Sequence, residues 1–229
     1  LDLEKRNKKI IPHKLRHHQK AALMDVLSGF KTYSRGQLIM ACGTGKTLIG
    51  LRLHEKLNSK LTVLMVPSLS LIKQNILYWA YQKQKNFSFR AVCSDSKVTR
   101  TLGTEYDSFV QQPADIGLPS ISNSKELVEF LSSKGSKVIF STYQSIHILQ
   151  EALKKTKKKI DLIIADEAHN IAGDKSGLFA TILDNKCIPS KKRLFLTATP
   201  RIYSERVKKA AAEVNQDLVS MDSFNDFGI

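Results

Sequence analysis

The chain has 229 residues, 42% hydrophobic and 25% charged, so it is long enough to bury a core and has an ordinary globular composition. Its 36 Lys and Arg against 21 Asp and Glu give a net charge of +15, which favours nucleic acid over other partners. The sequence contains no apolar run near the ~18 residues of a membrane span and no signal-peptide core at its charged start, so we expect no membrane partner.

Apolar runs and amphipathic stretches alternate along the chain. Runs that suit strands fall at 38–41, 61–66, 87–93, 137–141, 161–165, 193–197 and 218–221. Helical patterns fall at 11–30, 47–57, 68–79, 123–133, 145–155 and 204–213, and the polar stretch 94–122 is predicted to be a long surface loop. This alternation predicts right-handed βαβ units, and hence an α/β fold with a mainly parallel sheet between two helical layers.

The segment Met40–Thr47 has the composition of a phosphate-binding loop between a strand and a helix. The residues predicted to bind nucleotide there are Cys42, Gly43, Thr44, Gly45, Lys46 and Thr47. The glycines allow backbone N–H groups to turn toward an anion, Lys46 is expected to reach the β- and γ-phosphates, and the Thr47 hydroxyl to ligate Mg²⁺. Met40 departs from the full pattern, which has glycine at that position.

A second signal is the apolar run Asp161–Ala165, which ends in Asp166, Glu167, Ala168 and His169. An apolar strand of this kind suits the middle of a parallel sheet, and its carboxyl end is where such sheets bind ligands. We expect Asp166 to hold Mg²⁺ and Glu167 to orient and deprotonate the water that attacks the γ-phosphate.

Two basic clusters, Lys154–Lys159 and Lys191–Arg193, come just before predicted strands. They should therefore lie at the amino-terminal edge of the sheet, opposite the nucleotide. We interpret them as solvated faces, or as a source of generic electrostatic attraction, and not as a nucleic-acid track.

With these elements placed, the chain resembles the first RecA-like motor domain of a superfamily 2 helicase of the DEAD/DEAH-box type. The motifs arrive in the family's order: Leu15–Ala21, Gly43–Thr47, Val66–Ser70, Ser141–Ser145, Asp166–His169 and Thr197–Thr199. The amino-acid sequences of these motifs are most similar to those in the motors of restriction-type systems, such as the Res subunit of type III restriction enzymes. The resemblance implies a three-layer α/β/α P-loop NTPase fold that uses ATP and Mg²⁺.

The resemblance also implies roles for particular residues. It assigns the catalytic set to Lys46, Asp166, Glu167 and His169, and adenine recognition to Gln19. Nucleic-acid contacts fall on Pro67, Ser68, Ser70, Thr142 and Tyr143. Thr197 and Thr199 would couple the nucleotide state to nucleic acid through hydrogen bonds to His169 or Asp166. For Tyr143, stacking on a base or sugar and burial in the core are equally compatible with the sequence.

We expect residues 1–229 to form one ATP-binding domain, excised from a longer cytoplasmic protein and lacking the second RecA-like domain that supplies an arginine finger. Three widely spaced cysteines agree with a reducing compartment. The predicted function is ATP-driven helicase or translocase activity on DNA in a restriction-type or related bacterial or phage system. We expect this piece alone to be nearly inactive. The alternatives are an RNA helicase, a nucleotide-gated binding module without turnover, and another P-loop enzyme such as a kinase or GTPase.

Overall fold

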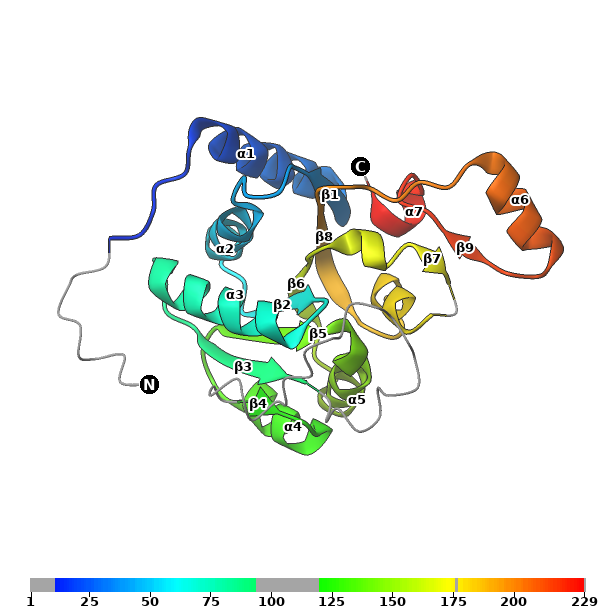
Figure 1. Cartoon of the computed structure of the whole chain (residues 1–229). Coiled ribbons are helices and arrows are strands. Elements are labelled where there is room, and N and C mark those ends of the chain that lie inside the picture. Colours follow the sequence, from blue (N-terminus) through cyan, green and yellow to red (C-terminus); the bar gives the residue numbers. More distant parts are fainter. Residues whose placement is uncertain (1–10, 94–119, 176, 229) are drawn as a thin grey trace.

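The computed structural model describes residues 11–93, 120–175 and 177–228 (Figure 1). Seven strands within these ranges form a parallel sheet in the order β1-β8-β6-β2-β5-β3-β4. Their bounds are Arg35–Ile39 (β1), Leu61–Val66 (β2), Ser88–Val92 (β3), Ser120–Ile121 (β4), Lys137–Thr142 (β5), Ile160–Ala165 (β6) and Ser190–Thr197 (β8). The predicted mainly parallel α/β fold is confirmed.

Helices cover both faces of this sheet. The α-helices are α1 (His17–Thr32), α2 (Lys46–Lys56), α3 (Leu69–Gln82), α4 (Ser124–Ser132), α5 (Ile146–Thr156), α6 (Glu205–Glu213) and α7 (Phe224–Phe227). The 3-10 helices are η3 (Tyr143–Ser145), η4 (Ala168–Asn170) and η5 (Leu178–Leu183). Helices α1 to α3 pack on one face, while α4, α5 and η5 pack on the other. None of the helices in the described ranges is long and apolar enough to cross a bilayer.

The central strands are buried from both sides because their side chains alternate between the two helical layers. All six residues of β2 and all six of β5 are buried. On β2, Val63 and Met65 contact the core under α4 and α5, whereas Leu64 and Val66 contact the core under α1 to α3. The parallel register then brings the carboxyl ends of β1, β8, β6, β2 and β5 to one edge of the sheet.

The structure corrects several predicted bounds. The helix expected from residue 11 begins at His17, because Arg16 is extended and its N–H donates to the Gln19 side chain at 2.9 Å. The loop predicted over 94–122 lies mostly outside the described residues, but Ser120–Ile121 forms β4. Asn123 is the N-cap of α4, and its side chain accepts from the Glu126 N–H at 3.0 Å.

The last predicted strand lies outside the main sheet. Residues Leu218–Val219 form β9, which pairs antiparallel with β7 (Gly173–Asp174) in a two-stranded sheet. Figure 1 shows this small sheet and α6 extending to one side of the domain. The short 3-10 helices and β7 had no clear periodic pattern to predict them.

The basic clusters lie at the amino-terminal edge of the sheet, as predicted, but the prediction that all their side chains face solvent is wrong for Arg193. Strand β6 begins directly after the first cluster, as predicted, whereas the second cluster lies within β8, which already begins at Ser190. The Arg193 side chain, however, is buried, with the residue 2% exposed, and it donates to the carbonyls of Ile182 and Ile188 and to Asn185. Burial lowers the pKa of Arg193 to about 10. Arg193 therefore holds the chain segment before β8 in place instead of facing solvent.

Candidate active site

The phosphate loop connects β1 to α2 at the carboxyl edge of the sheet. Gly43 and Gly45 have φ of 75° and 89°, a region that residues with a side chain rarely adopt. Gly45 is the N-cap of α2, so the free N–H groups of the first helical turn point out of the loop. This is the geometry that binds phosphate groups at a helix amino terminus.

Lys46 begins α2, and its ammonium group folds back over the loop. It donates to the carbonyl oxygens of Met40 at 2.9 Å and Ala41 at 3.3 Å, and the residue is only 9% exposed. Met40 therefore contributes its backbone carbonyl to the loop, a contact that does not depend on the side chain at this position. The N–H of Met40 in turn donates to the carbonyl of Thr197 at 3.0 Å and joins the loop to β8.

Asp166 and Glu167 follow β6 at the same edge. Burial and the neighbouring Glu167 raise the pKa of Asp166 to about 6, while the Glu167 N–H and the Lys46 ammonium lower it. The N–H of Glu167 donates to Asp166 Oδ1 at 3.1 Å. Lys46 thus lies close enough to act electrostatically on Asp166, although the two residues are far apart in sequence.

These groups suit a hydrated Mg²⁺ ion. A cation beside Asp166 would favour its charged form, which burial now disfavours. Thr47 adds a hydroxyl in the first turn of α2, and magnesium characteristically takes a few protein oxygens together with waters and phosphate oxygens. In the described part of the chain, no cluster of three or more His, Cys, Asp or Glu side chains could hold a metal ion alone. The residues present therefore fit a Mg²⁺ ion that arrives with a phosphate ligand.

His169 connects the acidic pair to the end of β8. Its Nδ1 lies 3.2 Å from the Thr197 hydroxyl and 3.3 Å from Glu167 Oε2. The same hydroxyl accepts from the backbone N–H of Thr199 at 3.1 Å. The contact expected between Thr197 and His169 is present. Thr199 is exposed, and its own hydroxyl has no hydrogen-bond partner within the described ranges.

Gln19 closes the other side of the loop. The residue is 5% exposed; its Oε1 accepts from Arg16, and its Nε2 donates to the Thr44 carbonyl at 2.8 Å. A Cβ atom on Gly45 would lie 2.3 Å from that nitrogen. Gln19 is thus packed directly on the loop, and a side chain at position 45 would have to displace the Gln19 amide as well as adopt a positive φ.

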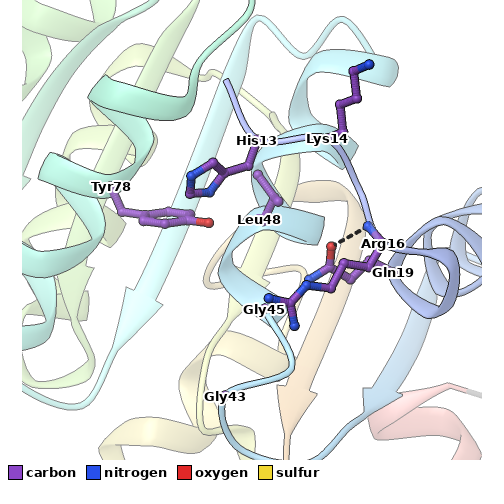
Figure 2. A pocket seen from close by; sticks show the side chains of 8 residues that line it. All are labelled: His13, Lys14, Arg16, Gln19, Gly43, Gly45, Leu48 and Tyr78. Atoms are coloured by element: carbon purple, nitrogen blue, oxygen red, sulfur yellow. Dashed lines mark hydrogen bonds between the residues drawn. The ribbon is translucent and has the colours of Figure 1, made fainter. Parts of the chain in front are cut away.

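A cleft of about 380 Å³ adjoins Gln19 and the loop (Figure 2). It is lined by His13, Lys14, Arg16, Gln19, Gly43, Gly45, Leu48 and Tyr78. Figure 2 shows the rings of His13 and Tyr78 on one side of this cleft and Gln19 beside Gly45 on the other. His13 is anchored because its N–H donates to Gln82 and its carbonyl accepts from Arg52.

Sequence reasoning did not single out His13, Arg16 and Tyr78 as part of this site. The first two belong to a stretch that was predicted as helix and is extended, and Tyr78 comes from α3, with no local motif around it. Cys42, predicted to be part of the loop, is an exposed free thiol.

The residues predicted to contact nucleic acid divide into two groups. Pro67, Ser68 and Ser70 lie after β2 and are partly or fully exposed, with the Ser68 and Ser70 hydroxyls 3.0 Å apart. Thr142, which ends β5, and Tyr143, which follows it, are buried.

Tyr143 corrects a prediction. Its side chain is 0% exposed and its hydroxyl donates to the carbonyl of Asp166 at 2.8 Å, so the phenol is not available to stack on a base. The Thr142 hydroxyl is likewise occupied, at 2.8 Å from the hydroxyl of Ser145. The alternative of a core tyrosine is the one that the structure shows.

The sheet order, the glycine loop and the acidic strand end together define an α/β domain of the RecA-like P-loop class. A family model described as "Type III restriction enzyme, res subunit" matches residues 12–202, which is well over half of the chain. The chain therefore belongs to this family, and the predicted superfamily 2 helicase motor domain is confirmed.

Individual relatives agree with this assignment. A probable helicase of African swine fever virus is 32% identical over 171 residues, covering 73% of this chain and 17% of the viral protein. Among solved structures, the ATP-dependent type ISP restriction-modification enzyme LlaBIII bound to DNA matches with a TM-score of 0.74 and 33% identity, covering 95% of this chain and 15% of that one.

A nuclease-deletion mutant of the type ISP enzyme LlaGI, in complex with a DNA substrate mimic, matches with a TM-score of 0.70 and 34% identity over 94% of this chain and 19% of that one. The chain thus spans less than a fifth of the length of these relatives. A SWI2/SNF2 ATPase core from Sulfolobus solfataricus shares the fold, with a TM-score of 0.55 at 18% identity, covering 83% of this chain and 33% of that one.

Proposed function

We propose that this chain is the ATP-binding half of a nucleic-acid motor, in which ATP hydrolysis is coupled to movement along DNA in a restriction-type or related system. The observation that carries the proposal is geometric: the glycine loop with Lys46 follows β1 and the pair Asp166–Glu167 follows β6, and both strands end at the same edge of the parallel sheet. A lysine and paired acids around a glycine loop are the parts that phosphoryl transfer requires.

Binding of the triphosphate falls to the loop and to Lys46. Outward-pointing N–H groups at the start of α2 would hold the phosphate oxygens, and the Lys46 ammonium would exchange its carbonyl partners for the β- and γ-phosphates. The Thr47 hydroxyl and the Asp166 carboxylate would hold Mg²⁺. When bound, that ion neutralises the charge that develops on the phosphate oxygens.

Hydrolysis needs a base that can orient water, and Glu167 is the proposed one. Its side chain is 31% exposed, so a water can reach it. His169 lies 3.3 Å from the Glu167 carboxylate and 3.2 Å from the Thr197 hydroxyl. We propose that this chain of contacts orients Glu167 and connects it to the end of β8.

The base of the nucleotide would occupy the cleft beside Gln19. The side-chain amide of Gln19 keeps a second N–H and a second lone pair beyond its two backbone contacts, which suits recognition of the adenine edge. The rings of His13 and Tyr78 provide flat surfaces across the cleft (Figure 2).

DNA is the proposed track because two of the structural neighbours are described as bound to DNA or to a DNA mimic, and because this chain carries a charge of +15. The exposed hydroxyls of Ser68 and Ser70, with their backbone N–H groups, suit contacts to phosphates without reading sequence. A second RecA-like domain would supply the arginine that completes the site, so we expect very slow turnover without it.

The test is ATP hydrolysis measured with duplex DNA, single-stranded DNA, RNA and no nucleic acid, in the longest form of the protein that contains this chain. Stimulation by DNA supports the proposal, and stimulation by RNA alone would favour the RNA helicase alternative. ATP binding without any turnover would favour a nucleotide-gated binding module.

A further inference from the structure

Tyr143 begins η3 directly after β5 and reaches the acidic end of β6. Its hydroxyl donates a 2.8 Å hydrogen bond to the backbone carbonyl oxygen of Asp166, and its ring packs against Phe179 with 5.2 Å between centroids. Burial and the charges of Asp166 and Glu167 raise the pKa of Tyr143 well above its usual value. The phenol is the donor in this contact, because a carbonyl oxygen can only accept a hydrogen bond.

The carbonyl that accepts this bond belongs to the peptide group between the two acidic residues. The N–H of the same peptide donates to Asp166 Oδ1 at 3.1 Å. Both polar groups of the peptide are thus held by side chains. One partner comes from the residue itself and the other from Tyr143, 23 positions earlier in the chain.

This peptide needs to be held, because Glu167 has an unfavourable backbone conformation. Its φ is 50° and its ψ is 49°, in the left-handed region that residues with a side chain rarely adopt. Rotation of the preceding peptide plane would let Glu167 leave this region and would turn its carboxylate away from the site. Such conformations persist at functional sites when surrounding contacts fix them.

The rest of the Asp166 backbone is fixed independently. The N–H of Asp166 donates to the Met65 carbonyl at 2.9 Å, and β2 lies between β5 and β6 in the sheet. Loss of the Tyr143 hydroxyl would leave that strand contact intact. Its effect should therefore fall on the peptide that follows Asp166 and not on the end of β6.

We propose that Tyr143 is a positioning residue, whose hydroxyl holds the Asp166–Glu167 peptide and so aims the Glu167 carboxylate at the attacking water. The inference rests on the proposed function, because the role of Glu167 in hydrolysis belongs to that proposal. It gives Tyr143 a task at the nucleotide site in place of the nucleic-acid contact predicted from sequence.

The test is Tyr143→Phe, which keeps the ring against Phe179 and removes only the hydroxyl. We expect the affinity for a fluorescent ATP analogue with Mg²⁺ to stay within about twofold, because the loop and Lys46 are untouched. In the longest form of the protein that contains this chain, single-turnover hydrolysis of radiolabelled ATP should slow by about 10- to 100-fold, the loss typical of a misplaced catalytic group.

Ser136→Ala is the matched control. It also removes a hydroxyl that donates to a backbone carbonyl, that of Ser59, at 2.8 Å, and it lies just before the opposite end of β5. This variant should hydrolyse ATP at the wild-type rate. A Tyr143→Phe rate equal to wild type, or an equal loss in both variants, would overturn the inference.

A crystal structure of Tyr143→Phe separates the inference from the proposed function. A rotated peptide after Asp166, with Glu167 out of the left-handed region, supports the positioning role. An unchanged peptide overturns it. If the wild-type protein itself shows no ATP hydrolysis that depends on Glu167, the proposed function fails, and this structural comparison still decides what Tyr143 holds.

Discussion

Substitution of Gly45 by alanine tests how Gln19 and the phosphate loop fit together. Gly43 and Gly45 both have positive φ, so alanine at either position should cost about 1 kcal/mol of backbone strain. The space around them differs. A Cβ on Gly43 would meet no atom within 4 Å, whereas a Cβ on Gly45 would lie 2.3 Å from the Gln19 amide nitrogen.

Gly45→Ala must therefore displace the Gln19 amide and break its contacts with Thr44 and Arg16. Each such hydrogen bond contributes about 0.5 to 1.5 kcal/mol. We expect Gly45→Ala to lower the free energy of unfolding by about 1 to 3 kcal/mol more than Gly43→Ala does. Urea unfolding followed by circular dichroism measures both values.

The double variants isolate the cause. In a Gln19→Ala background the Gln19 amide is gone, so Gly45→Ala and Gly43→Ala should cost nearly the same. Equal effects in the wild-type background would refute the steric argument. A difference that persists without the Gln19 side chain would refute it as well.

Three further substitutions test the assigned roles. Lys46→Ala should abolish binding of a fluorescent ATP analogue, because the phosphate-binding charge is lost; affinity close to wild type would remove Lys46 from the site. Glu167→Gln should keep nucleotide affinity and stop hydrolysis in the single-turnover assay, and retained hydrolysis would contradict its role as the base. Asp166→Asn should stabilise the fold at pH 7. Folding raises the pKa of the wild-type carboxyl from 3.8 to about 6. The ionised carboxylate therefore destabilises the folded state increasingly as the pH rises through this range, and asparagine removes that cost. The free energy of unfolding should rise by at most on the order of 3 kcal/mol, from a pKa shift of about two units. In urea unfolding at pH 5 this increase should be smaller. An increase that does not depend on pH would refute this explanation. His54, whose pKa is lowered to about 4, titrates over the same range but is present in both proteins.

The sequence alone predicted those parts of the site that are formed by residues adjacent in the chain. The loop at Gly43–Thr47 and the acidic end of β6 are local patterns, and the parallel sheet brings them to one edge because each follows a strand. The bounds of most strands were predicted within a few residues for the same reason, since buried parallel strands are apolar along their whole length. The nucleic-acid contacts at Pro67, Ser68 and Ser70 and the second motor domain stay predictions.

Contacts between distant segments could not be predicted in this way. The burial of Arg193 depends on three acceptors supplied by the preceding segment, and a basic cluster in sequence does not reveal them. Tyr143 lies in a motif that suggested a surface, yet its position after β5 points it at Asp166. His13 and Tyr78 meet at the cleft only because the segment before α1 crosses α2 and α3, where Arg52 and Gln82 hold it.

The central claim is that Lys46, Thr47 and Asp166 surround one triphosphate. A crystal structure of this chain with a non-hydrolysable ATP analogue and Mg²⁺ measures this directly. We predict the Lys46 ammonium on the β- and γ-phosphate oxygens, the metal ion between the Thr47 hydroxyl and the Asp166 carboxylate, and the base in the cleft beside Gln19. A nucleotide bound elsewhere, or bound with its phosphates away from Lys46 and Asp166, would contradict the account.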